Sequence, residues 1–221
     1  MERKIIVCLK KGGQRDMAEA FAERIGAVLT EQPGEELTVL FDASGVSLMG
    51  YGLTYQGNFE TMLHRVTCGR LQHEMLVRAA KKNGDSLKGI DATAGMGEDA
   101  FLLAAYGYEM TLYEQNPVVA ELLKDALRRA RNHPLLKEIA ERMTLIEEDS
   151  VDGLKNSRGE NDLIYLDPMF PGRQKSGLIN KKLQLIQKLE PPCSKEEELF
   201  DAAIQAGPSK IVVKRPLKSP F

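Results

Sequence analysis

The 221-residue sequence lacks the cysteine and histidine spacings that hold a structural metal. Its three cysteines, Cys8, Cys68 and Cys193, lie far apart with no Cys-x-x-Cys pair, and its three histidines show no metal-ligand spacing. We therefore expect reduced thiols, a cytoplasmic location and no metal centre. No apolar stretch is long enough to span a bilayer, and the apolar run Ile5–Leu9 is too short for a signal sequence, so we expect no membrane association.

The chain also lacks a strong charge of either sign, since 30 Lys and Arg residues oppose 32 Asp and Glu residues. That balance indicates no general preference for nucleic acid. Two segments, 172–188 and 207–221, nevertheless contain basic residues and no acid. Such a surface is compatible with a phosphate-rich partner, with a solvated lysine surface as the alternative. The candidate RNA-binding residues are Arg70, Arg173, Lys175, Lys181, Lys182, Lys214 and Arg215.

The first 84 residues predict a small unit ahead of the main domain. Apolar runs and turn residues there indicate strands at 4–9, 37–41 and 45–49, helical spacing from Met17 to Val28, a glycine-rich loop at 50–57 and a helix at 70–82. We therefore place a small α+β unit at residues 1–60 and a connecting loop and helix at 61–84.

From residue 85 onward the pattern changes to alternating strands and helices. We predict strands ending at Asp91 and spanning 110–114, 143–146, 163–166 and 211–214, with helices at 99–106, 117–131, 178–189 and 195–206. Repeated β-α-β units indicate an α/β fold with a parallel sheet and helices on both faces. Ligands of such sheets bind at the carboxyl ends of the strands. Residues 85–221 form this domain, and we cannot place a final helix and hairpin after Lys214.

The stretch Asp91–Asp99 reads as a strand that enters a glycine turn and then a helix. Gly95 and Gly97 allow a tight turn and a close approach of the backbone to a ligand. Acids and hydroxyls around the turn can reach a polar ligand, namely Asp91, Thr93, Glu98 and Asp99. The pattern departs from a full G-x-G-x-x-G because Ala100 stands at its last position. The stretch predicts a nucleotide-like cofactor, and a tight turn without a ligand is the alternative.

Two later strand ends add candidate cofactor contacts. Glu114 lies about 20 residues beyond the glycine turn, where an acid can accept hydrogen bonds from ribose hydroxyls. Gln115 follows it and could line the same site, or be a solvated loop residue. Asp149 and Ser150 follow the third strand, where Asp149 could accept from an adenine amine or cap a helix. NAD and S-adenosylmethionine both present a ribose diol, so Glu114 does not distinguish them.

The segment Asp167-Pro-Met-Phe-Pro171 favours a methyl donor over a nicotinamide. The exocyclic amine of a base is a poor nucleophile because its lone pair is delocalised into the ring. A site that methylates it must hold its N–H groups, and the Asp167 carboxylate and the Pro168 carbonyl can accept them. Phe170 can stack on the base, which is worth about 1–3 kcal/mol. Asp167, Pro168 and Phe170 are therefore the candidate catalytic residues, with a packing phenylalanine at a strand-end turn as the alternative.

Together these motifs resemble the ribosomal RNA small subunit methyltransferase J family. The resemblance rests on segments 91–100, 114–120, 165–171, 175–176 and 212–216. It implies a class I, Rossmann-like methyltransferase sheet and transfer from S-adenosylmethionine to N2 of a guanine in 16S ribosomal RNA, alone or in the small subunit, with S-adenosylhomocysteine as product. It also implies that the cofactor-site positions are Glu98, Asp99, Glu114, Gln115, Asp149, Ser150 and Asp167.

The sequence departs from the family in two places. The glycine-rich stretch expected before the first strand survives only as Cys68-Gly69-Arg70, and the carboxyl-terminal hairpin is absent. Two other functions stay open from the residues alone. One is methylation of another amine, on a different base, a protein or a small molecule; the other is a cofactor-binding RNA module without turnover. The oligomeric state does not follow from the sequence.

Overall fold

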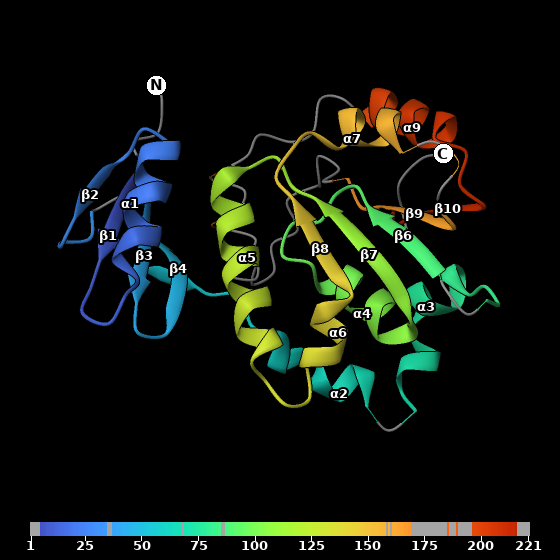
Figure 1. Cartoon of the computed structure of the whole chain (residues 1–221), viewed down its shortest axis with the longest axis horizontal. Coiled ribbons are helices and arrows are strands. Elements are labelled where there is room, and N and C mark those ends of the chain that lie inside the picture. The colour runs from blue at the N-terminus through green and yellow to red at the C-terminus, as the bar shows by residue number, and fades with distance from the viewer. Residues whose placement is uncertain are drawn as a thin grey trace.

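The computed structural model of the protein describes residues 5–34, 37–67, 69–84, 87–157, 159, 161–168, 185, 189 and 196–215. The described chain forms two five-stranded sheets with helix α5 (Pro117–Arg131) between them (Figure 1). Among these residues, no helix has the length and apolar character needed to cross a membrane.

The first sheet has the strand order β2-β1-β3-β4-β5, and helix α1 (Arg15–Arg24) packs on β1 and β2. Strand β1 is parallel to its neighbours β2 and β3, whereas β3, β4 and β5 pair antiparallel. The strands are β1 (Ile5–Leu9), β2 (Val28–Thr30), β3 (Leu37–Asp42), β4 (Gly45–Gly50) and β5 (Leu53–Tyr55). The predicted strands β1, β3 and β4 are confirmed.

Two expectations in this region are wrong. The helical spacing that we extended to Val28 ends earlier, because Gly26 adopts a left-handed φ of 64° just beyond the last turn of α1, and Val28 begins β2. The glycine-rich loop contains β5, which pairs with β4 through Leu48–Tyr55 and Gly50–Leu53. Both missed strands have only three residues, so their periodicity is too short to identify.

The connecting segment is more broken than the predicted helix over 70–82. It contains η1 (Phe59–Met62), α2 (Leu63–Val66), η2 (Leu71–His73) and α3 (Met75–Ala80). Helix α3 begins late because Glu74 before it is extended, with φ −62° and ψ 127°. Arg65 donates two hydrogen bonds of 2.8 and 2.6 Å to the Glu74 carboxylate, a contact between residues nine positions apart that the helical spacing does not indicate.

The second sheet is parallel throughout, with the order β10-β9-β6-β7-β8. Its strands are β6 (Leu87–Asp91), β7 (Tyr108–Tyr113), β8 (Met143–Ile146), β9 (Leu163–Leu166) and β10 (Lys210–Val213). Counted from β6 this is the order 3-2-1-4-5 of a doubly wound sheet, whose ligands bind where the order reverses, between β6 and β9. The predicted α/β sheet with parallel strands is confirmed.

Helices cover both faces of this second sheet. On β9, Leu163 and Tyr165 pack with α4 (Glu98–Tyr106), whereas Ile164 and Leu166 pack with α7 (Ser150–Asn156) and α9 (Glu196–Gln205). This alternation follows from the two-residue period of a strand. The short helix α6 (Lys137–Glu141) was not predicted, and α7 was weighed only as a helix that Asp149 could cap. The predicted helix over 178–189 lies outside the described residues, apart from Leu185 and Leu189.

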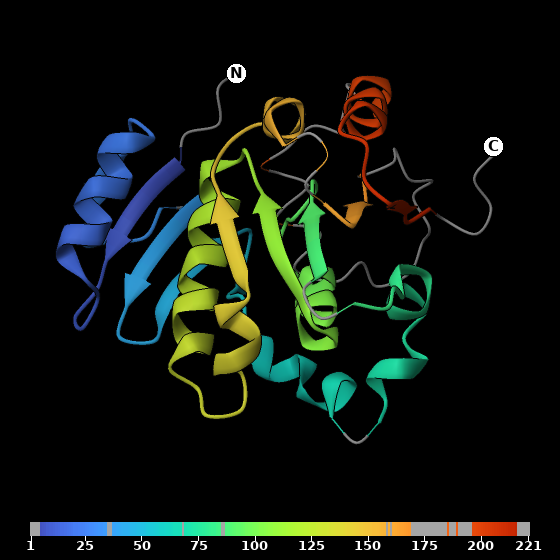
Figure 2. The same ribbon diagram turned by 45° about the vertical axis from the view of Figure 1, so that its right-hand side comes forward.

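Helix α5 lies between the two sheets (Figure 2), and it carries apolar residues on opposite sides. Val118, Val119 and Leu122 pack with the first sheet, and Leu123 and Leu127 pack with the second. The helix begins as predicted at Pro117, where the missing N–H does no harm, and Asn116 caps it by accepting from the backbone N–H groups of Val118 and Val119.

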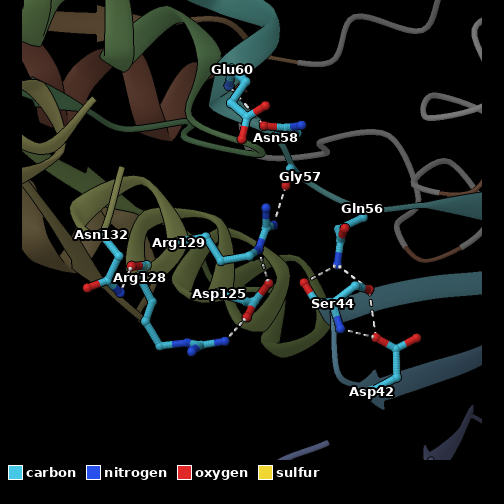
Figure 3. A network of polar contacts seen from close by, with 10 residues as sticks. All are labelled: Asp42, Ser44, Gln56, Gly57, Asn58, Glu60, Asp125, Arg128, Arg129 and Asn132. Atoms are coloured by element: carbon cyan, nitrogen blue, oxygen red, sulfur yellow. Dashed lines mark hydrogen bonds and ion pairs between the residues drawn. The ribbon is translucent and has the colours of Figure 1, made fainter. Parts of the chain in front are cut away.

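A polar cluster on α5 binds the linker between the two sheets, which runs from residue 56 to residue 86 (Figure 3). The Asp125 carboxylate is fully buried and accepts from Arg128 at 2.6 Å and from Arg129 at 2.8 Å. Arg129 also donates to the carbonyl of Gly57 in the linker. A side chain at Gly45 would come within 2.5 Å of the same carboxylate, so the β3–β4 turn packs directly on Asp125.

Candidate functional site

The glycine turn after β6 has the backbone that its sequence predicted. Gly95 and Gly97 both adopt left-handed conformations, with φ of 51° and 73°. A Cβ atom on Gly97 would lie 2.9 Å from the Leu123 side chain of α5, so the turn also needs the missing side chain there. Glu98 and Asp99 follow in the first turn of α4, where negative charge is favourable.

Glu114 connects the glycine turn to the end of β7. Its carboxylate is 8% exposed and accepts from the backbone N–H of Gly95 at 3.0 Å and of Asn116 at 2.8 Å. Glu114 therefore contacts the glycine turn directly, and its contact with a ribose stays a prediction. Gln115 is exposed at the same strand end.

Asp149 ends the loop after β8 and caps helix α7. Its side chain accepts from the backbone N–H of Val151 at 2.9 Å, so the capping role weighed from the sequence is present. Ser150 is the first residue of α7, and both residues are half-buried.

Asp91 and Thr93 link the ends of β6 and β9. Asp91 is 1% exposed, and its carboxylate accepts from the backbone N–H of Thr93 at 3.0 Å. Burial raises the pKa of Asp91 to about 7, against the hydrogen bond from Thr93. The Thr93 hydroxyl accepts from the backbone N–H of Asp167 at 2.7 Å. The glycine turn and the Asp167 motif, which are separate in sequence, are therefore joined directly.

Four polar side chains from α4, β9 and β10 meet at this point. Lys214 follows β10 and lies 2.7 Å from Asp99 Oδ2 and 2.7 Å from Asp167 Oδ2. The Tyr165 hydroxyl donates to Asp99 Oδ2 at 2.6 Å. Burial, and then the charge of Asp99, raises the pKa of Tyr165, so this hydroxyl stays a donor. The sequence did not predict Tyr165 as part of the site, although a hydroxyl in the buried strand Leu163–Leu166 was an available signal.

The remaining predicted residues fall in two groups. Pro168 is buried directly after Asp167, whereas Arg70 and Arg215 are exposed on the described surface. Phe170, Arg173, Lys175, Lys181 and Lys182 lie outside the described residues. Within the part of the chain that the structure describes, no group of three or more His, Cys, Asp or Glu side chains could hold a metal ion.

The carboxyl ends of the five parallel strands thus carry the predicted acids in one row. Strand order places Asp149 after β8, Glu114 after β7, Asp91 and the glycine turn at β6, Asp167 after β9 and Lys214 after β10. A row of acceptors beside a left-handed glycine turn can hold a ligand that offers hydroxyl, amine and cationic groups.

Comparisons with known proteins agree with this arrangement. The SAM-dependent methyltransferase family model matches residues 53–221. Ribosomal RNA small subunit methyltransferase J of Pseudomonas aeruginosa (strain LESB58) is 35% identical over 217 residues, covering 95% of this chain and 83% of that protein. The protein of the same name from Aeromonas salmonicida (strain A449) is 46% identical over 128 residues, covering 58% of this chain and 51% of that protein.

A solved structure supports the fold assignment over the whole chain. The crystal structure of a SAM-dependent methyltransferase from Neisseria gonorrhoeae has a TM-score of 0.75 at 26% sequence identity, covering 99% of this chain and 87% of that chain. The fold is therefore the Rossmann-like sheet of S-adenosylmethionine-dependent methyltransferases, and the resemblance of the motifs is confirmed. The chain belongs to the ribosomal RNA small subunit methyltransferase J family.

Proposed function

We propose that the protein methylates the exocyclic N2 amine of a guanine in 16S ribosomal RNA, in the cytoplasm, with S-adenosylmethionine as methyl donor. The observation that carries the proposal is the hydrogen bond from Asp167 N–H to the Thr93 hydroxyl. It fixes the candidate amine acceptor beside the candidate cofactor turn. The relatives bear the name of a small-subunit ribosomal RNA methyltransferase, which supports the substrate class.

The residues present fit S-adenosylmethionine. When bound, this cofactor supplies an electrophilic methyl group on a sulfonium. Gly95 and Gly97 allow close approach of the backbone, Glu114 would accept from the ribose hydroxyls, and Asp149 from the adenine amine. Asp91, whose pKa burial raises to about 7, is a carboxyl that an approaching cation would stabilise in its charged form. The proposed cofactor positions also include Thr93, Glu98, Asp99, Gln115, Ser150 and Asp167.

The proposed chemistry is mainly positioning. The Asp167 carboxylate and the Pro168 carbonyl would accept the two N–H groups of the guanine amine and aim its nitrogen at the methyl group. Asp167 would also accept the proton that the amine loses as the methyl group is transferred. Phe170 stacks on the base after it leaves its paired or stacked position, which costs a few kcal/mol. Fixing two reactants in this geometry can remove much of the barrier.

The proposal is tested by transfer of a tritiated methyl group to unmodified small-subunit RNA, followed by nucleoside analysis. N2-methylguanosine is the expected product. A product methylated on a ring carbon, or on another base, would contradict the proposed substrate atom.

Glu114→Ala is expected to weaken binding of S-adenosylhomocysteine by about 10-fold or more, because one or two charge-assisted hydrogen bonds are lost at about 1.5–3 kcal/mol each. The same carboxylate holds the Gly95 and Asn116 N–H groups, so the glycine turn loosens as well. Isothermal calorimetry measures the affinity. The control is Glu109→Ala, an exposed acid on the same strand. Equal affinities in the two variants, or a wild type that binds NAD alone, would contradict the assignment.

Lys181→Glu combined with Lys182→Glu is expected to weaken RNA binding and to flatten its dependence on salt, by about one unit of slope for each RNA phosphate that is no longer neutralised. Both lysines belong to segment 172–188, which contains no acid. We propose that this segment is part of a phosphate-binding surface, together with Arg70, Arg173, Lys175 and Arg215. Filter binding at several salt concentrations measures the slope. The matched control replaces Lys137 and Lys155, which are exposed on α6 and α7, by Glu. An unchanged slope would assign Lys181 and Lys182 to a solvated surface.

A further inference from the structure

Lys214 is held beside the acceptor motif by its own backbone. Its N–H donates to the carbonyl of Leu166 at 2.8 Å, which extends the β9–β10 pairing by one residue beyond the strand. The side chain therefore starts level with Asp167 at the carboxyl edge of the sheet. Sequence alone grouped Lys214 with the candidate RNA-binding lysines.

The ammonium of Lys214 joins two carboxylates that belong to different parts of the site. Asp99 comes from the start of α4, directly after the glycine turn, and Asp167 follows β9. Both Oδ2 atoms lie 2.7 Å from Lys214 Nζ. Asp99 is itself fixed by the Tyr165 hydroxyl, so the lysine ties Asp167 to a rigid point.

The surroundings of Lys214 oppose a direct contact with RNA phosphate. An ammonium has three N–H donors, and two of them are used by Asp99 and Asp167. A phosphate that approached the third would meet two carboxylates. Burial by itself lowers the pKa of Lys214, but the hydrogen bonds that it donates to Asp167 and Asp99 outweigh burial and raise the pKa, so the side chain stays charged.

We infer that Lys214 is a positioning residue for methyl transfer, which holds Asp167 through Oδ2 so that Oδ1 accepts an N–H of the target amine. The inference rests on the proposed function. Lys214 acts through Asp167 and forms no bond to substrate. Its expected signature is therefore a loss of turnover rather than of RNA affinity.

The test compares Lys214→Met with the wild type in steady-state methyl transfer. The kcat is expected to fall about 100-fold, because an Asp167 carboxylate that is no longer held in place aligns the target amine poorly with the methyl group. The KM for RNA, its salt dependence and the affinity for S-adenosylhomocysteine should change less than about threefold. The matched control is Lys210→Met at the start of β10, because the Lys210 ammonium donates to the Ala79 and Lys81 carbonyls instead of to carboxylates. Its kcat should stay near the wild-type value once thermal midpoints confirm folding.

A double-variant cycle separates positioning from an independent contribution. Adding Lys214→Met to Asp167→Asn should cost little beyond Asp167→Asn alone, because the lysine acts through that residue. Lys214→Arg should restore part of the activity. A fall in RNA affinity and salt slope at unchanged kcat would overturn the inference in favour of a phosphate contact. Fully additive losses, or a wild-type kcat in Lys214→Met, would also overturn it. The identity of the wild-type methylated nucleoside tests the proposed function separately.

Discussion

Asp167→Ala is expected to lower kcat for methyl transfer about 1,000-fold, the largest catalytic effect predicted for any single change. The substitution removes the carboxylate that we propose accepts the amine N–H, while the hydrogen bond from the Asp167 backbone N–H to the Thr93 hydroxyl is kept. S-Adenosylhomocysteine affinity could fall with it, because Asp167 is also a proposed cofactor position. Tritiated methyl transfer under saturating cofactor measures the effect on turnover.

Two further variants are compared with Asp167→Ala, one that removes another acid beside β9 and one that removes the proposed stacking ring. Asp162 lies at the opposite end of β9 and also pairs with a lysine, Lys82, so Asp162→Ala controls for loss of an acid from this strand. Its kcat should remain near the wild-type value. Phe170→Ala should lose activity strongly with little change in cofactor affinity, since stacking on the base is worth about 1–3 kcal/mol. Robust methylation by Asp167→Ala would show that the motif has another role.

Asp125→Ala should lower the free energy of unfolding by about 3 kcal/mol, the largest stability effect expected here. The fully buried carboxylate forms ion pairs with the guanidinium groups of Arg128 and Arg129, and its removal leaves both cations without this partner (Figure 3). The Arg128 and Arg129 side chains are 40% and 26% exposed, so water reduces the cost below that of a fully buried pair. Thermal and urea unfolding measure the change, which corresponds to a shift of about 10 °C in Tm.

The control for Asp125 is Asp152→Ala. Asp152 also pairs with a basic residue three positions along a helix, Lys155, but its side chain is 74% exposed. Exposed pairs of this kind contribute about 0–1 kcal/mol. If Asp125→Ala were no less stable than Asp152→Ala, the linker and α5 would be held together by apolar packing alone.

The sequence predicted those elements whose local pattern is long or carries a cap. Helix α5 has the predicted bounds because Pro117 starts it, Asn116 caps it and its apolar period continues to its end. Strands β8 and β9 are short, but each is a largely apolar run between polar residues, and their bounds are also confirmed. Strands β2 and β5 are stabilised by pairing with β1 and β4. Each has only three residues, and Val28 in β2 is 58% exposed, so the sequence at these positions carries no strong strand pattern.

The candidate site also has one part that the sequence predicts, its residues, and one part that it does not, their contacts. Each acid lies at a strand end because the strand pattern ends there, and sequence suffices to find Asp91, Glu114 and Asp167. Contacts among them depend on the order of strands in the sheet. Lys214 reaches Asp99 and Asp167 only because β10 lies beside β9 and β9 beside β6. No spacing along the chain specifies that adjacency, so a residue expected on an RNA-binding surface is found between two carboxylates.

Mass mapping of 16S ribosomal RNA from a strain lacking the gene tests the central claim most directly. We expect one guanine to lose its N2 methyl group, wild-type protein to restore it, and Asp167→Ala to leave it unmethylated. An unchanged methylation map in the deletion strain, or the loss of a methyl group from any atom other than a guanine N2, would contradict the proposed function.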